Sequence, residues 1–247
     1  EDFRRRIEQQ SRAREAEQAR IHEQAAKKAQ WLWKTATPAT DHPYLQRKQV
    51  KAYGLRIAKD GRLIVPAYDT SGSIRTLQFI SDNGEKWFLP GGQKRGCFCE
   101  IPGDIGAIYI GEGLATMLTV HEDTGSHAVI SFDAGNLLPV ARMIRQKYPE
   151  SEIIIAADND RWTTGNPGLS KARQAAKLIK ARVAVPKFKD VSSKPTDWND
   201  LHAFEGIDAV KQQLQTSTGL IFVKRGDPES GTRKRIKISF RNSKNGN

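Results

Sequence analysis

The apolar positions of this chain follow two different rhythms, which divide the sequence into unlike parts. Between residues 104 and 218, short apolar runs alternate with segments in which apolar residues recur every three or four positions. The first pattern is typical of buried strands and the second of amphipathic helices. Their alternation predicts a parallel sheet covered on both faces by helices. The predicted strands are 107–111, 128–132, 152–157 and 182–186, and the predicted helices are 114–123, 138–147, 169–180 and 208–215.

Residues 42–103 show strand and turn signals instead. Apolar residues are dense in 63–67, they alternate with polar residues in 73–80, and the turn residues of 69–72 separate the two segments. Asn83-Gly84 is a strong hairpin signal and precedes a further apolar segment at 86–89. Residues 90–96 form a basic, glycine-rich loop. This part is therefore expected to be a small antiparallel subdomain with positive charges on its loops.

The two ends of the chain lack both rhythms. Residues 1–34 contain strong helix formers and neither glycine nor proline, which predicts one long, largely solvated helix anchored by Trp31 and Trp33. A connector closes this region at residue 41. Residues 224–247 carry eight Lys and Arg against two acids, so the tail at 219–247 either folds on nucleic acid or links to another domain. The expected fold class is α/β: a parallel sheet flanked by helices, preceded by a strand-rich basic subdomain and a long helix.

The charge and the cysteine content of the chain limit the kinds of binding partner and site that we expect. The 247 residues carry a formal net charge of +12 and include no run of transmembrane length. This excess of positive charge favours a polyanionic partner, although a basic surface also serves solubility. Cys97 and Cys99 are too few for a disulfide framework or a four-cysteine zinc site, and a reducing cytoplasm is the expected location. Because the chain begins with Glu and shows no signal peptide, we expect a fragment of a longer protein.

Three acids follow predicted strands of the parallel sheet. Glu112 ends the run 107–111, and Asp158 and Asp160 follow the run 152–157. Ligand sites of such sheets lie at the carboxyl ends of the strands, and Mg²⁺ prefers carboxylate oxygens. The order therefore predicts a site for Mg²⁺ or Mn²⁺ that serves chemistry on nucleic acid. The alternative roles are helix capping for the aspartates and a surface ion pair for Glu112.

A second acidic group follows the last predicted strand. Asp197 and Asp200 are candidates to bind a second ion at the same edge. Alternatively, Asn199 or Asp200 caps the helix that begins there. Asp133 also lies at a strand end, and Asn136 beside it is a candidate cap. The turn 165–168 precedes a helix and either receives a phosphate or is an ordinary tight turn.

Basic residues are interleaved with aromatic residues in the strand-rich part. Such a groove suits a single nucleic-acid strand, because bases stack on rings while cations follow the phosphates. Trp87 and Phe88 are the candidate stacking residues, and core packing is the alternative for both. The candidate nucleic-acid contacts are Arg47, Lys48, Arg75, Lys86, Lys94 and Arg95.

Several of these motifs resemble a known family. Ile110-Gly111-Glu112-Gly113, followed by Ala156-Ala157-Asp158-Asn159-Asp160, is similar to the Toprim domain of primases, topoisomerases and nucleases. The segments 42–48 and 64–69 resemble the amino-terminal half of a DnaG-type primase core. The segments 131–137 and 196–201 are similar to phage and plasmid primases, including conjugative ones.

The resemblance implies synthesis of short RNA primers from ribonucleoside triphosphates on single-stranded DNA. Glu112, Asp158 and Asp160 would be the metal-binding acids, and Asp197 matches a further acid of the family. Thr116 and Asn199 stand where the family usually has acids, so the second ion would depend on Asp197 with Asp200 or Asp133. The implied partners include a replicative helicase or an upstream zinc-binding domain. Two other functions remain open: a Toprim nuclease, which needs the same acids, and a non-catalytic single-strand-binding module.

Overall fold

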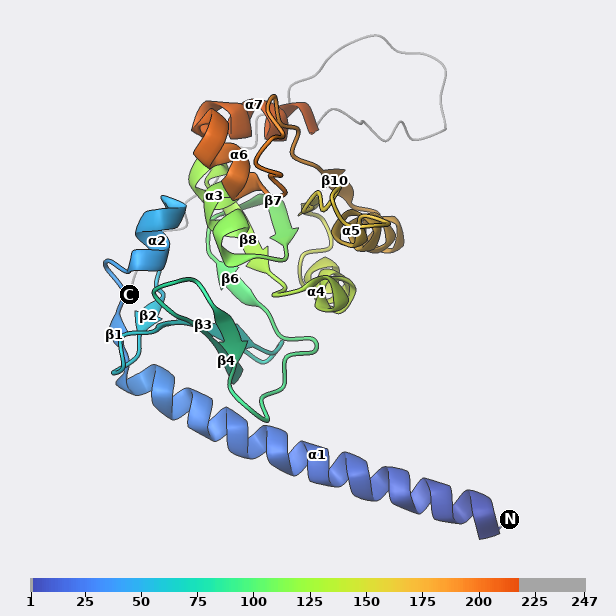
Figure 1. Ribbon diagram of the computed structural model, residues 1–247. Coiled ribbons are helices and arrows are strands. Elements are labelled where there is room, and N and C mark those ends of the chain that lie inside the picture. The colour runs from blue at the N-terminus through green and yellow to red at the C-terminus, as the bar shows by residue number, and fades with distance from the viewer. Residues whose placement is uncertain (1, 218–247) are drawn as a thin grey trace, which may run out of the picture.

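The computed structural model describes residues 2–217 and contains two sheets with a long helix beneath them (Figure 1). The predicted basic tail and the strand expected at 220–223 lie outside these residues. The helices are α1 (Asp2–Thr35), α2 (Pro43–Lys48), α3 (Leu114–Thr124), α4 (Ala134–Lys147), α5 (Pro167–Ile179), α6 (Trp198–Glu205) and α7 (Ile207–Ser217). The strands are β1 (Thr37–Pro38), β2 (Arg56–Ile57), β3 (Leu63–Tyr68), β4 (Ile74–Ile80), β5 (Lys86–Phe88), β6 (Cys99–Ile101), β7 (Asp104–Gly111), β8 (Ser126–Ile130), β9 (Glu152–Ala156) and β10 (Arg182–Ala184).

The first sheet is antiparallel, with the order β1-β2-β3-β4-β5. Successive side chains of its central strands, β3 and β4, point to opposite faces, and nearly all of them are buried because both faces are covered. Leu63 and Val65 of β3 belong to the large core that this sheet shares with the second sheet, whereas Ile64 faces α1. The antiparallel arrangement confirms the prediction for this segment.

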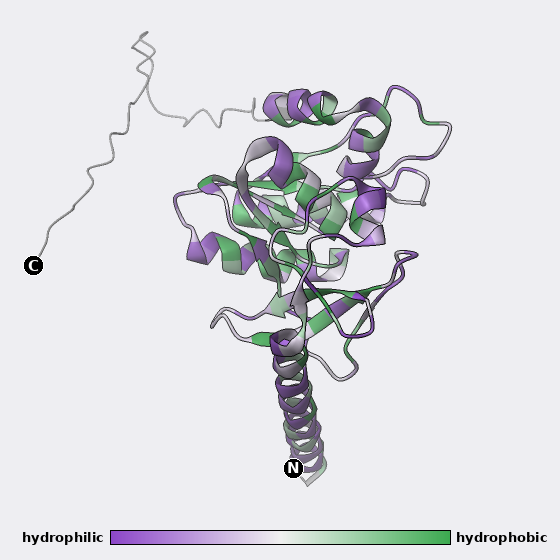
Figure 2. Ribbon diagram, turned by 90° about the vertical axis from the view of Figure 1, so that its left-hand side faces the viewer, coloured by the Kyte–Doolittle hydropathy of each residue, from purple (hydrophilic) through white to green (hydrophobic). Residues whose placement is uncertain are grey.

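Helix α1 contacts this sheet only through its carboxyl-terminal part. Ala25 and Ala29 are buried there against β4, while the amino-terminal half projects away from the body and is mostly hydrophilic (Figure 2). The prediction that both tryptophans anchor the helix is wrong in part. Trp33 contacts the guanidinium of Arg56, whereas Trp31 is 58% exposed. Small alanine side chains let the helix approach the strand closely, and the indoles remain at the rim.

The second sheet has the order β10-β9-β7-β8-β6, and all of its neighbouring pairs are parallel except β6 with β8. Helices α3, α6 and α7 cover one face around Met117 and Trp198. Helices α4 and α5 cover the other face around Val140 and Ala172. The predicted sheet with helices on both faces is confirmed, with an antiparallel edge strand added.

A short helix, α2, lies where strands and turns were expected. His42 caps it by accepting a hydrogen bond from the Tyr44 N–H at 3.2 Å, and Pro43 stands in its first turn. Proline suits this position because its missing N–H would have no partner in the helix. Six residues are too few to show the helical period, so only His42-Pro43 marked this helix in the sequence.

Two predicted boundaries near the site are wrong. The strand predicted to run through Phe132 ends at Ile130, because Phe132 has a φ of +73°, which turns the chain out of the sheet. The helix predicted to start at Leu138 begins at Ala134, capped by Asp133. Pro139 therefore lies inside α4 rather than at its start, where it only removes the hydrogen bond to the Gly135 carbonyl.

The two cysteines are buried and free. Cys99 lies in β6, whereas Cys97 precedes that strand, so only one of them is a strand residue. Within residues 2–217, no helix is both long enough and apolar enough to cross a membrane.

Candidate active site

Neighbouring parallel strands bring Glu112 and Asp158 to the same edge of the second sheet. Glu112 directly follows β7, and Asp158 comes two residues after β9. These strands pair in parallel, with Ile110 opposite Ile155, so their carboxyl ends coincide. The structure thus brings together acids that are 46 residues apart in the sequence.

Two glycines allow this close approach. A side chain at Gly111 would meet the carbonyl oxygen of Ala156 at 3.0 Å and the sulfur of Met117. A side chain at Gly168, near the start of α5, would meet Oδ2 of Asp160 at 2.8 Å. A Cβ at Gly111 would press on the backbone of the neighbouring strand, and a Cβ at Gly168 would displace the carboxylate of Asp160. The turn at 165–168 thus places a helix start directly beside Asp160.

Asn159 fixes the loop that carries the two aspartates. Its amide Nδ2 donates to the Pro186 carbonyl at 3.2 Å, and its Oδ1 accepts from Asn166 at 2.9 Å. Its backbone N–H donates to the Thr196 carbonyl at 2.7 Å. These three bonds turn Asn159 toward the protein, and Asp158 and Asp160 occupy the flanking positions. Asn159 is therefore a positioning residue for both carboxylates.

The carboxylates of Glu112 and Asp158 have oxygen atoms without partners. Glu112 Oε1 and Asp158 Oδ1 are both buried, and neither has a hydrogen-bond partner. Burial, followed by the charges of Asp160 and Asp133, raises the pKa of Glu112 to about 7. Burial, with the charges of Asp197, Glu112 and others, also raises the pKa of Asp158 well above its usual value. Buried unpaired carboxylate oxygens are costly unless a cation compensates them.

Asp197 and Asp200 form a capping box at the start of α6. Asp197 Oδ1 accepts from the Asp200 N–H at 2.8 Å, and Asp200 Oδ2 accepts from the Thr196 N–H at 2.8 Å. The helix cap is therefore Asp197, and the prediction of Asn199 or Asp200 as the cap is wrong. Burial and the charge of Asp200 raise the pKa of Asp197, whose charge also acts on Asp158. Asp197 thus both caps the helix and faces the carboxylate cluster.

Asn199 and Thr116 stand where the Toprim primases that the sequence resembles usually have acids, and both side chains are buried. Asn199 is 2% exposed and donates from Nδ2 to the Lys48 carbonyl at 2.7 Å and to Thr119 Oγ1 at 3.0 Å. Thr116 is buried within α3. Asn199 therefore ties α6 to α2 and α3, which is a structural role.

The oxygen atoms of these carboxylates are suitable ligands for a divalent cation, but the side chains do not yet surround a common point. Hard carboxylate oxygens are the ligands that Mg²⁺ prefers, and two of them here lack other partners. Across residues 2–217, however, no three His, Cys, Asp or Glu side chains converge closely enough to hold an ion as they stand. Ion binding would therefore require side-chain movements that draw the carboxylates together.

Three of the predicted nucleic-acid cations lie close to the acids. Lys86 projects from β5 within electrostatic reach of Asp197 and Asp158, although loss of hydration lowers its pKa. The charge of Lys48, at the end of α2, acts on Asp197. Lys94 forms an ion pair with Asp133 at 2.5 Å. Positive charge therefore borders the carboxylates from the side of the first sheet.

The other three predicted cations have different surroundings. Arg47 donates to the Asp82 carbonyl at 2.8 Å. Arg75 is paired with Glu23 of α1 at 3.3 Å and with Asp69 at 3.8 Å, so it lies apart from the carboxylates. Arg95 is exposed and lines a pocket beside α4 and α5.

The two aromatic candidates point to opposite faces of β5. Phe88 packs edge-on against Phe132, with ring centroids 5.3 Å apart, and so belongs to the interior near the site. Trp87 stacks on Phe79 on the other face and is 38% exposed. Packing therefore accounts for Phe88, and the exposed part of Trp87 faces away from the acids.

The basic loop is fixed to the second sheet by one buried amide. Asn136 Nδ2 donates to the Cys97 carbonyl at 2.8 Å and to the Ser131 carbonyl at 2.9 Å, and its Oδ1 accepts from the Gly96 N–H at 2.7 Å. The expectation that Asn136 is a helix cap is wrong, because Asp133 has that role. Asn136 instead joins the loop of the first part to α4 of the second.

Comparison with known proteins identifies the second part. Residues 107–208 match the Toprim domain family. These residues form a Toprim domain. The match includes Glu112, Asp158, Asp160 and the capping box, which are the acids assembled at the sheet edge.

Most of the chain is similar to DNA primases. It is 38% identical over 188 residues to the DNA primase TraC of Escherichia coli, covering 71% of this chain and 18% of that protein. The chain thus spans under a fifth of the length of this relative. Its fold matches a DnaG primase catalytic domain solved with single-stranded DNA (TM-score 0.56, 12% identity, 81% and 80% of the two chains). It also matches the primase fragment of the bacteriophage T7 primase-helicase (TM-score 0.55, 17% identity, 74% and 77%).

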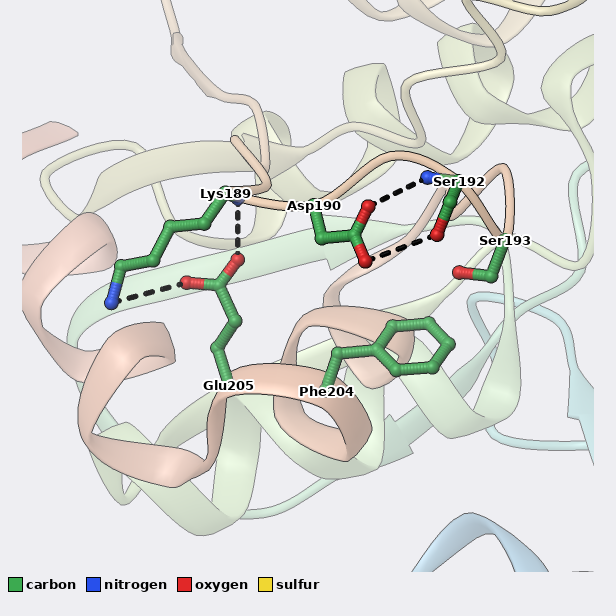
Figure 3. Close-up of a pocket in the computed structure, with 6 residues that line it drawn as sticks. All are labelled: Lys189, Asp190, Ser192, Ser193, Phe204 and Glu205. Atoms are coloured by element: carbon green, nitrogen blue, oxygen red, sulfur yellow. Dashed lines mark hydrogen bonds and ion pairs between the residues drawn. The ribbon is translucent and has the colours of Figure 1, made fainter.

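A hollow at the far end of α6 is separate from the acids of the Toprim domain. Its polar groups pair with one another: Lys189 with Glu205, and Asp190 with Ser192 (Figure 3). Asp197 and Glu205 are eight residues apart, so about 12 Å of helix lies between this hollow and the carboxylates. The hollow adds nothing to the site.

Sequence reasoning missed three groups that shape the site. Asn159 and Asn136 act through hydrogen bonds to distant segments, which no local pattern marks. The basic side chains of α4 and α5 had a visible signal, since neither helix contains an acid.

Proposed function

We propose that this chain is the catalytic core of a primase, which joins ribonucleotides into short primers on single-stranded DNA. The observation that carries this proposal is the pair of buried, unpartnered oxygens of Glu112 and Asp158 at adjacent strand ends. Similarity to the primases described above supports the polymerising reaction in particular.

Glu112, Asp158 and Asp160 would hold Mg²⁺ or Mn²⁺, with Asp197 contributing its second oxygen. When bound, a divalent cation at such a site activates the attacking hydroxyl and stabilises the leaving pyrophosphate. Asp200 would support Asp197 through the capping box rather than bind an ion itself, because its Oδ2 already accepts backbone hydrogen bonds.

The cations around the carboxylates would orient the incoming ribonucleotide and the single-stranded template. Lys86 faces Asp158 and Asp197, and is placed to contact the phosphates of the incoming ribonucleotide. Lys94 and Lys48 border the same edge and would draw the template toward it, since phosphate contacts supply sequence-independent affinity. Arg47 and Arg95 would extend this contact, whereas Arg75 is held by Glu23 of α1 and Asp69, away from the carboxylates. A replicative helicase or a zinc-binding domain would be the protein partner.

The test is primer synthesis by the 247-residue chain on single-stranded DNA with labelled ribonucleotides and Mg²⁺ or Mn²⁺. The wild-type chain should extend, and Glu112→Gln should lose about a thousandfold or more, equivalent to several kcal/mol of transition-state stabilisation. Affinity for the single strand should stay within about threefold, because the cations are untouched. Synthesis by Glu112→Gln at the wild-type rate would overturn the assignment.

The same acids suit a nuclease, and the same assay separates the two activities. A nuclease would shorten the labelled single strand with Mg²⁺ and add no ribonucleotide. Binding without either activity would identify a non-catalytic module instead. The unpartnered carboxylate oxygens favour an enzyme, since a module for binding alone gains nothing from buried unpaired charge.

A further inference from the structure

A pocket of about 380 Å³ lies between α4, α5 and the basic loop, and none of the carboxylates of the candidate active site lines it. We propose that it binds backbone phosphates of the single-stranded DNA template as this strand leaves the carboxylate edge. Three of its lining side chains are the cations Arg95, Arg142 and Lys171, and Gln174 supplies an amide. The inference extends the proposed function by giving the template a second contact.

The cations of the pocket are available to a ligand. Three acids of the surrounding elements are already paired with other cations: Asp133 with Lys94, Glu100 with Lys147, and Glu152 with Arg182. None of these pairs includes Arg95, Arg142 or Lys171, all of which are exposed. No acid lines the pocket, so the charged side chains of the lining all attract an anion.

The two helices around the pocket are positive throughout. Helix α4 contains three basic residues, Arg142, Arg145 and Lys147, and no acid. Helix α5 likewise contains Lys171, Arg173 and Lys177 and no acid. On the opposite face of the sheet, α6 and α7 both contain acids. This asymmetry gives one face of the Toprim domain a potential that attracts polyanions.

The pocket continues directly from the carboxylate cluster. Ala134 lines the pocket, and its backbone acts on the Glu112 carboxylate, where it partly offsets the raised pKa. On α5, Gly168 lies close to Asp160, since a Cβ added there would meet its Oδ2 at 2.8 Å. Lys171, which lines the pocket, follows one helical turn later. Eight residues separate Ala134 from Arg142, which is about 12 Å along a helix axis. A strand that passes the carboxylates can therefore enter the pocket within a few nucleotides.

The lining chemistry favours backbone phosphate over a free nucleotide. The lining contains three cations, one amide and small or aliphatic side chains, but no aromatic ring on which a base could stack. A nucleotide site would need such a surface or polar groups aimed at the base edge. Phosphate contact alone is independent of sequence, as a template track requires.

The experiment measures binding of the 247-residue chain to fluorescent oligothymidylates of increasing length at several salt concentrations. The pocket pair Arg142→Gln with Lys171→Gln is compared with the matched pair Arg173→Gln with Lys177→Gln. The matched pair removes the same charge from α5 residues that do not line the pocket. Thermal melting checks that both variants are folded.

For oligonucleotides long enough to reach both sites, the pocket pair should weaken binding about tenfold. It should also reduce the magnitude of the salt slope by about 1.4, since each lost single-strand phosphate contact contributes about 0.7. The matched pair should leave the slope unchanged, and very short oligonucleotides should bind all chains alike. Arg142→Lys should keep the wild-type slope, because the phosphate contact needs the charge.

Two results would overturn the inference. Equal losses for the two pairs would mean that only net charge matters. Lost affinity for Mg²⁺-ATP with unchanged binding to long oligonucleotides would make the pocket a nucleotide site. A chain that binds strands as expected but makes no primer would refute the proposed function and leave this inference standing.

Discussion

The five acids at the sheet edge fall into two sets that differ in how their oxygens are satisfied. Glu112 and Asp158 end strands, and each has a buried oxygen without a partner. Asp197 and Asp200 start a helix and accept backbone hydrogen bonds from each other's segment. Asp160 stands beside the first set, against Gly168. The difference teaches that closeness in space does not give carboxylates the same role, because a satisfied carboxylate has less to gain from a cation.

The largest expected effect on primer synthesis comes from replacing one aspartate of each set by asparagine. Asp158→Asn should reduce primer synthesis about a thousandfold or more, whereas Asp200→Asn should reduce it by no more than a few-fold. Initial rates of ribonucleotide incorporation on a single strand measure both. A thousandfold loss in Asp200→Asn would erase the distinction and place Asp200 among the metal ligands.

A metal-dependent change in melting temperature would sharpen the comparison without any catalysis. Mg²⁺ at about a hundred times its dissociation constant should stabilise the wild-type chain by about 2.7 kcal/mol, or roughly 5–10 °C. Glu112→Gln and Asp158→Asn should lose most of this gain, and Asp200→Asn should keep it. Calorimetry with and without a chelator measures the shift, and equal gains in all chains would contradict the ligand assignment.

The smallest expected effect concerns pH. Because burial raises the pKa of Glu112 from 4.5 to about 7, the folded chain holds a proton that the unfolded chain has released. Stability from this group is therefore present below pH 4.5 and is lost as the pH rises to about 7. In metal-free buffer at pH 8, Glu112→Gln should be more stable than wild type by on the order of 1 kcal/mol, after allowance for solvent contact. Denaturant titrations at pH 5 and pH 8 measure this difference, and an identical pH dependence in both chains would contradict it.

Much of the second sheet was predictable because its strands are continuous apolar runs. The apolar runs 107–111 and 152–157 predict that Glu112 and Asp158 follow strand ends. The positive φ of Phe132 was not predictable, because it depends on packing against Phe88 from the other sheet. Helix α2 was missed because six residues contain too little pattern.

The roles of the individual acids needed the structure. Asp197 and Asp200 have the spacing of a capping box, but a sequence does not show where the preceding loop ends. Asn199 is a polar residue near the acids, and only its contacts with Lys48 and Thr119 show that it is a packed link. The sequence also could not show that Arg75 is paired, because its partner Glu23 is 52 residues away in the chain.

The buried Asn136 amide has a consequence for how such a protein can diverge. It joins residues 96 and 97 to residue 131, so the loop carrying Lys94 and Arg95 cannot be moved without disturbing the carboxylate edge. The basic loop and the carboxylate edge are therefore inherited as one unit. A basic loop taken from a relative would keep this arrangement only if its backbone offers the same N–H and carbonyl groups to the Asn136 side chain.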